Sequence, residues 1–167
     1  VICGQHLLFA NAGLVRGVTN SELMFSFGAD MVMLNTFNFD DDSKSLGLQG
    51  LSYQELRALC RRPIGVYMGC PGTDADVEDG LYDRGGMLAT PKHVERAVEM
   101  GVDFIVLGGN PGSGTRIADV LATTARVKGC YGDGGFAGGS SPENIHQLSI
   151  SIKGMPYTYY RMASVNR

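Results

Sequence analysis

The sequence of 167 residues contains no long apolar run and no cluster of basic residues. Its apolar stretches, such as residues 31–34, are far shorter than the roughly 18 residues that a membrane-spanning helix needs. There are 14 Lys and Arg against 17 Asp and Glu, which gives a net charge of −3, whereas a surface that binds nucleic acid concentrates basic side chains. We therefore expect neither nucleic acid nor a membrane as a partner.

The four cysteines, Cys3, Cys60, Cys70 and Cys130, lie too far apart for a C-x-x-C pair. This spacing argues against a zinc ribbon or a redox-active dithiol. Reduced thiols and the lack of a recognisable secretory leader indicate a cytoplasmic protein, and the first residue, Val1, suggests a longer or processed product. Among the cysteines, only Cys70, at the end of an expected strand, stands where a reactive thiol would be useful.

Glycine is abundant, with 24 residues, and the 44% hydrophobic content is that of a globular domain with a core. Two capping boxes, Thr19 with Glu22 and Ser52 with Glu55, mark helix starts, and a third helix is expected to start at Pro91. Buried strands are expected over residues 31–34, 64–70 and 104–107, and further amphipathic helices over 117–128 and 142–152. Strands that alternate with helices in this way predict βαβ units and a parallel sheet.

One strand is missing from this alternation. The helix that ends near Lys128 leads directly into the Gly-rich segment 132–139, although such a loop normally follows a strand that directs it. We therefore predict a discontinuity near residues 129–131, where part of the domain is absent.

Two Gly-rich motifs are specific enough to suggest a family: Asn-Pro-Gly-Ser-Gly at 110–114 and Gly-Asp-Gly-Gly-Phe-Ala-Gly-Gly at 132–139. With these, the segments 17–23, 28–35, 62–66, 101–109 and 142–145 extend the similarity over nearly the whole chain. Together they resemble an uncharacterised bacterial (β/α)8-barrel family whose members are loosely labelled phosphoenolpyruvate-phosphonomutase-like. In that family the two motifs lie several βα units apart, whereas here they are close in the sequence.

The resemblance implies an α/β fold of the (β/α)8 TIM-barrel type, incomplete, with four to five βα units represented in a single domain over residues 1–167. A complete barrel takes about 250 residues, so the middle strands would be absent. The resemblance also implies a lyase, mutase or isomerase that acts on a phosphorylated or carboxylated metabolite at the C-terminal face of the barrel.

The segment 108–115 is Gly-rich and lies between an expected strand and an amphipathic helix. Backbone N–H groups of such a turn form an anion site, and the segment has neither the ending of a Walker A loop nor the spacing of a dinucleotide fingerprint. The alternative is a tight turn that needs glycine for geometry alone. The expected phosphate-binding residues are Asn110, Gly112, Ser113 and Gly114.

The segment 132–140 is the second candidate for anion binding. Barrels frequently hold phosphate with the loops after the seventh and eighth strands, and the resemblance gives this place to the segment. The expected contacts are with Gly134, Gly135, Gly138 and Gly139. Asp133 is either a general base or metal ligand, or a cap of its own loop.

Asn35 ends an expected strand, and His6 lies near the end of a first strand that we place within residues 1–8. Residues at the C-terminal ends of barrel strands are frequently catalytic, so both are candidates, with His6 as a general acid or base. The three carboxylates at 40–42 are suited to Mg²⁺, as in phosphonomutase-like enzymes, or else form a solvated turn. His93 and His146 fall on expected helices and are predicted to lie at the surface or at an interface.

The sequence thus predicts a small-molecule enzyme with Asn35, Asp133 and His6 as catalytic residues, Mg²⁺ as a candidate cofactor and a small anionic metabolite as its partner. The alternative is a non-catalytic or degenerate barrel that binds a small anionic ligand or assembles with another half-barrel. Because an open half-barrel exposes strand edges, we expect a homo-oligomer.

Overall fold

The computed structural model describes residues 1–9, 13–71, 85–108, 117–131 and 149–152. These residues form a five-stranded sheet with the order β1-β2-β3-β4-β5. Its strands are β1 (Cys3–Leu7), β2 (Met31–Asn35), β3 (Ile64–Gly69), β4 (Phe104–Gly108) and β5 (Ser149–Ile152). The first four strands are parallel, and β5 is antiparallel to β4.

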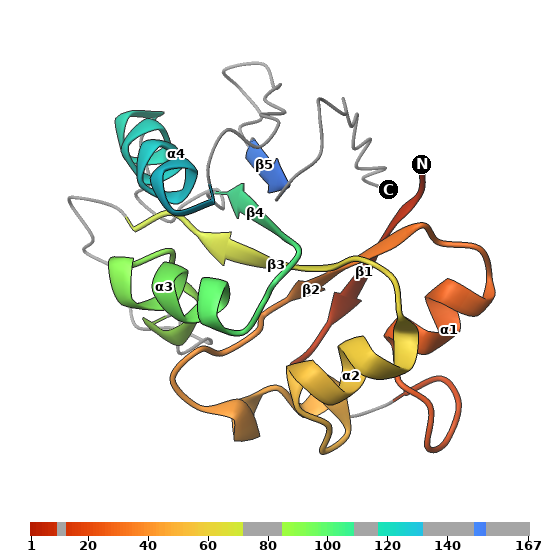
Figure 1. Ribbon diagram of the computed structural model, residues 1–167. Coiled ribbons are helices and arrows are strands. Elements are labelled where there is room, and N and C mark those ends of the chain that lie inside the picture. The colour runs from red at the N-terminus through yellow and green to blue at the C-terminus, as the bar shows by residue number, and fades with distance from the viewer. Residues whose placement is uncertain (10–12, 72–84, 109–116, 132–148, 153–167) are drawn as a thin grey trace, which may run out of the picture.

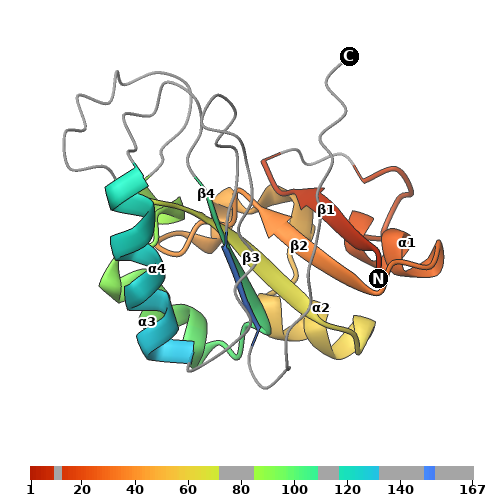
Figure 2. The same ribbon diagram turned by 90° about the horizontal axis from the view of Figure 1, so that it is seen from above.

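Helices alternate with the parallel strands along the chain. They are α1 (Asn20–Ser26), α2 (Tyr53–Cys60), α3 (Pro91–Glu99) and α4 (Ile117–Tyr131), with the short 3-10 turns η1 (Asp42–Lys44), η2 (Leu46–Leu48) and η3 (Gly85–Met87). Buried side chains from all four helices join one core with one face of the sheet, and Figures 1 and 2 show the helices arranged around that face. The result is an α/β fold with four parallel strands, as the sequence predicts at this level.

Side chains of a strand point alternately to the two faces of a sheet, and β2 is buried on both. Val32 and Leu34 belong to the core shared with the helices, whereas Met31 and Met33 belong to a second cluster formed with β4. We call the face that carries the second cluster the inner face. The uninterrupted apolar run of β2 is therefore explained by burial on both faces of the sheet, as the sequence predicts.

Local signals in the sequence account for the helix starts. Both capping boxes are formed, with Thr19 preceding α1 and Ser52 preceding α2. Thr90 accepts a hydrogen bond at the start of α3, where Pro91 is the first helical residue. These three predicted helix starts are confirmed.

The helix expected over residues 142–152 is wrong for its last four residues, because Ser149–Ile152 form β5. The segment Ser-Ile-Ser-Ile alternates polar and apolar residues with the period of two that is typical of a strand, and its isoleucines are β-branched. The helical spacing of a few apolar residues hid this shorter pattern. The helix expected over 117–128 is α4, which continues past Lys128 to Tyr131, so a helix directly precedes residue 132. Within the described ranges, no helix is long and apolar enough to cross a membrane.

Candidate functional site

The carboxyl ends of the parallel strands meet along one edge of the sheet, where Asn35 ends β2 and Gly108 ends β4. In the β2–β3 register Met33 lies opposite Gly65. Asn35 and Tyr67, two residues further along each strand, therefore lie opposite each other. Because neighbouring strands are about 5 Å apart, these two side chains are neighbours on the same face.

That face is the inner face. Asn35 follows Met31 and Met33 at intervals of two, and Tyr67 packs against the cluster that contains both methionines. A Cβ atom added to Gly108 would lie 2.3 Å from the Tyr67 Oη, so the phenol occupies the space that a side chain would need. Asn35, Tyr67 and Gly108 thus form a row across three strands, which we call the inner-face row.

Tyr67 was not a candidate in the sequence analysis. Its side chain is partly exposed, and burial raises the pKa of Tyr67 to about 12. The phenol is therefore protonated at neutral pH and able to donate a hydrogen bond. No residue in the described part of the chain forms a hydrogen bond with its hydroxyl. The signal that would have found Tyr67 is its position in an apolar strand, in register with Asn35.

Thr36 follows Asn35 in an unusual backbone conformation. Its φ of 63° lies in the left-handed region, which β-branched residues rarely adopt and which costs about 1–3 kcal/mol. The Thr36 Oγ1 donates to the Asn35 carbonyl oxygen at 2.6 Å and accepts from the N–H groups of Leu8 and Phe9, both at 3.1 Å. These bonds tie the end of β1 to the end of β2 and hold the backbone of Asn35 in place.

His6 lies on the other face of the sheet. It is opposite Leu34 in the register, faces the helices and is only 1% exposed. Its Nδ1 is 2.8 Å from Ser21 Oγ, and a Cβ on Gly47 would come within 2.9 Å of its Nε2. Burial lowers the pKa of His6 to about 4, so the imidazole is neutral at physiological pH. The structure does not bring His6 together with Asn35, which faces the inner side.

The segment that follows Asn35 is held against α3. Asp40 contacts Lys92 Nζ at 2.6 Å and His93 Nε2 at 3.1 Å, and the hydrogen bond from Lys92 lowers the pKa of Asp40. His93 stacks on Phe39 with ring centroids 5.8 Å apart, and its Nδ1 is 2.8 Å from the Leu88 carbonyl oxygen. His93 is buried within the chain, so the prediction that it lies at the surface or at an interface is wrong. Helical spacing does not reveal that a distant loop covers this part of α3.

The other two acidic residues of this segment have separate partners. Asp41 caps η1 by accepting a hydrogen bond from the Ser43 N–H at 3.0 Å, and Asp42 lies 3.5 Å from Arg96. The three carboxylates therefore do not converge on one point. No group of three or more His, Cys, Asp or Glu that could hold a metal occurs in the ranges that the structure describes.

Asn38, which precedes the three carboxylates in the same candidate stretch, fixes this segment. It is 1% exposed, and its Oδ1 accepts from the N–H groups of Asp40 and Asp41 at 3.0 and 2.9 Å. A Cβ on Gly86 would lie 2.1 Å from this oxygen. Because two backbone donors bond to Oδ1, this end of the amide is the oxygen. The same two bonds fix the shape of the loop after β2, beside η3.

Cys70 directly follows β3 and faces the helices. Burial raises the pKa of Cys70 to about 11, and it also raises the pKa values of Cys3 and Cys60 to about 11. Since the thiolate is the reactive form, these raised pKa values leave little of it at neutral pH, which disfavours Cys70 as a nucleophile.

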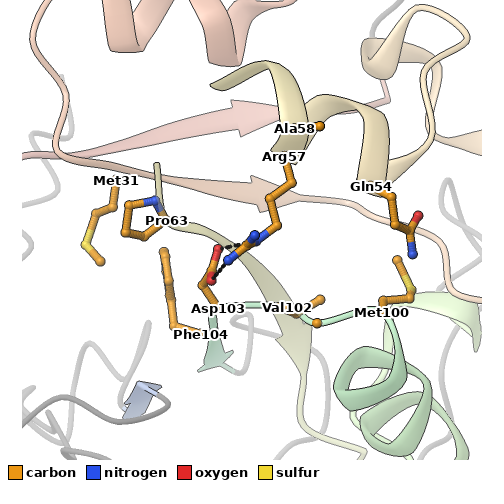
Figure 3. A pocket seen from close by; sticks show the side chains of 10 residues that line it. Met31, Gln54, Arg57, Ala58, Pro63, Met100, Val102, Asp103 and Phe104 are labelled. Carbon is orange, nitrogen blue, oxygen red and sulfur yellow. Dashed lines mark hydrogen bonds and ion pairs between the residues drawn. The ribbon is translucent and has the colours of Figure 1, made fainter. Parts of the chain in front are cut away.

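A pocket of about 520 Å³ lies at the opposite edge of the sheet, beside the amino ends of β2, β3 and β4 (Figure 3). The figure shows Arg57 of α2 directed at Asp103, to which its Nε donates at 2.9 Å. Asp103 also accepts from the Ile64 N–H at 2.9 Å. The guanidinium is thus already paired, and these contacts join α2 to the sheet.

Several predicted site residues lie outside the described residues. They are Asn110, Gly112, Ser113 and Gly114 of the first Gly-rich segment, Asp133, Gly134, Gly135, Gly138 and Gly139 of the second, and His146. Gly108, where the first segment begins, is described and belongs to the inner-face row.

A family model described as a domain of unknown function, DUF7916, matches residues 1–131 and 129–167. The chain belongs to the DUF7916 family. Neither a curated protein nor a solved structure matches it. The two matched segments of the DUF7916 chain overlap at residues 129–131.

Proposed function

We propose that this DUF7916 chain binds a small anionic metabolite, phosphorylated or carboxylated, at the carboxyl edge of its parallel sheet. The observation that carries the proposal is the inner-face row, in which Asn35 and Tyr67 lie side by side and the phenol reaches Gly108. Gly108 is the first residue of the Gly-rich segment 108–115. Parallel α/β folds bind their ligands at this edge, where loops follow the strands.

The Gly-rich segments supply the attraction for an anion. Backbone N–H groups of residues 112–114, before α4, and of residues 134–139 are the donors that we assign to the negatively charged oxygens. Asn110 and Ser113 add polar side chains from the first segment. The amide of Asn35 orients the ligand from the neighbouring strand, because it carries both a donor and an acceptor.

The fold that we propose is an incomplete (β/α)8 barrel of one domain, with a discontinuity at residues 129–131. The resemblance to the phosphonomutase-like family supports a lyase, mutase or isomerase reaction, with Asp133 moving a proton and Mg²⁺ as a candidate cofactor. We assign no catalytic step to His6, because its imidazole faces the helices and bonds to Ser21. Fold alone does not determine chemistry, so turnover has to be tested separately from binding.

The test is a panel of ligands in thermal unfolding and calorimetry: inorganic phosphate, pyruvate and phosphorylated three-carbon acids, each with and without Mg²⁺. The proposal predicts saturable stabilisation by at least one of them, about 2.7 kcal/mol when the ligand is at 100 times its Kd. Product formation followed by NMR then separates an enzyme from a binding protein. A panel that produces no saturable stabilisation contradicts the proposal.

A second function, assembly with another copy of the chain, is favoured by β1. In the described sheet β1 is an edge strand, and no charged side chain occurs before Arg16. Leu7 and Phe9, at its end, are 43% and 47% exposed. Uncharged strand edges tend to pair with other chains. Sedimentation velocity tests this function: a dimer that Gln5→Lys dissociates supports it, and a wild-type monomer contradicts it.

A further inference from the structure

We infer that Tyr67 is a ligand-binding residue whose hydroxyl donates a hydrogen bond to an oxygen atom of the bound anion. The inference rests on the proposed function, and it adds a specific side chain to a site that was otherwise built from Asn35 and backbone amides. It also narrows the ligand to one that places an oxygen acceptor over the end of β4.

The position of the hydroxyl carries the argument. Tyr67 lies in β3 on the inner face, opposite Val106 of β4 in the register. Its ring extends along the sheet to Gly108, where a Cβ would be 2.3 Å from Oη and 2.9 Å from the ring carbons Cε2 and Cζ. The absence of a side chain at Gly108 thus leaves the phenol at the start of the Gly-rich segment, where the anion is proposed to bind.

The hydroxyl of Tyr53 is used within the fold, whereas the hydroxyl of Tyr67 is available to a ligand. The Tyr53 side chain is 2% exposed, and its Oη donates to the Ile64 carbonyl oxygen at 2.7 Å, which joins α2 to β3. Tyr67 is partly exposed instead, and none of the described residues hydrogen-bonds to its hydroxyl. A phenol hydroxyl that no described residue engages is available to a ligand oxygen, which would take the place of water there.

The protonation state determines which ligand atoms fit. Because burial holds the Tyr67 phenol in its protonated form, the hydroxyl donates to carboxylate, phosphoryl or carbonyl oxygens. Asn35, its neighbour on β2, adds an amide donor on the same face. Two donors on adjacent strands suit an anion with at least two accessible oxygens, which both carboxylates and phosphates provide.

The experiment compares wild type, Tyr67→Phe and the matched control Tyr53→Phe by calorimetry with inorganic phosphate and with pyruvate. Tyr67→Phe removes only the hydroxyl and is expected to keep the wild-type urea midpoint, because no bond to a described residue is lost. It is also expected to weaken binding about 10-fold or more, the usual effect of losing a hydrogen bond to a charged group. Tyr53→Phe is expected to lower the urea midpoint and to bind both probes as wild type does.

The outcomes distinguish this inference from the proposed function. If wild type binds a probe and Tyr67→Phe binds it equally well, the role of Tyr67 is overturned while the proposed function stands. If wild type binds neither phosphate nor pyruvate nor any phosphorylated three-carbon acid of the panel, both the role of Tyr67 and the proposed function are overturned. If Tyr53→Phe loses affinity as much as Tyr67→Phe does, the effect belongs to the fold and the specific role is overturned.

Discussion

The imidazole of His6 and the hydroxyl of Ser21 lie 2.8 Å apart and join β1 to α1 inside the core on the helix side of the sheet. Both side chains are buried, His6 at 1% exposure and Ser21 at 0%. A positive charge on the buried imidazole would be removed from water, so the folded protein favours the neutral form of His6. A histidine placed in this way couples the stability of the fold to pH.

Stability is expected to fall as the pH is lowered from 7 to 5. The ordinary pKa of histidine is 6.5, whereas the pKa of His6 in the folded protein is about 4, so the unfolded state binds more protons between these values. The contribution of neutral His6 is present above pH 6.5 and is lost progressively towards pH 4. We expect this residue alone to account for about 2 kcal/mol between pH 7 and pH 5 in urea unfolding.

The variant His6→Asn provides the comparison. Asparagine keeps a polar atom near the position of Nδ1 and does not titrate. The free energy of unfolding of His6→Asn should therefore fall by about 2 kcal/mol less than that of wild type between pH 7 and pH 5. Equal pH dependence in wild type and His6→Asn would show that His6 is not the group responsible.

Loss of the first helix cap is expected to destabilise the protein by about 1 kcal/mol. Thr19 Oγ1 accepts from the Glu22 N–H, while the Glu22 carboxylate accepts from the Thr19 N–H at 2.9 Å. Thr19→Ala removes the side-chain half of this box, whereas Thr19→Ser keeps it. Urea unfolding should therefore rank wild type and Thr19→Ser above Thr19→Ala, and an unchanged midpoint for Thr19→Ala would contradict the role of the cap.

The features that the sequence predicts well are local ones. The boxes at Thr19 and Ser52 and the proline at 91 act within four residues, so a single stretch of sequence contains the whole signal. The positions of β2, β3 and β4 follow from their largely apolar runs, which burial on two faces requires, whereas β5 was not predicted. Asn35 is placed at a strand end by the same reasoning, and the structure puts it there.

The features that the sequence does not predict depend on contacts between distant segments. His93 is buried because Phe39 and Asp40, more than 50 residues earlier, pack on α3. Tyr67 joins the site through the register of β3 with β2 and β4, which no local pattern contains. To predict which side of the sheet His6 faces, one likewise needs the strand boundaries and the position of α1.

Arg57 and Asp103 form the ion pair at the amino edge of the sheet, and replacing one or the other should lower the free energy of unfolding by different amounts. Arg57 is 47% exposed, and removal of its pairing with Asp103 in Arg57→Ala typically costs up to about 1 kcal/mol. Asp103 is 21% exposed and also accepts from the Ile64 N–H, so Asp103→Ala leaves a part-buried donor unpaired, at about 1–3 kcal/mol.

Urea unfolding of both variants in low and high salt measures this difference. Salt should reduce the effect of Arg57→Ala more than that of Asp103→Ala, because the backbone hydrogen bond is less sensitive to screening than the ion pair. Equal losses in the two variants would mean that the bond to Ile64 contributes nothing.

The most direct test of the proposed site is a titration of the isotope-labelled protein with inorganic phosphate and with pyruvate, followed by backbone amide NMR. The account predicts saturable shifts of amides at the carboxyl edge, at Asn35, Gly69 and Gly108, and unshifted amides at Arg57 and Asp103 on the opposite edge. Shifts confined to the amides around Arg57 and Asp103, or no saturable shift with either probe, would contradict it.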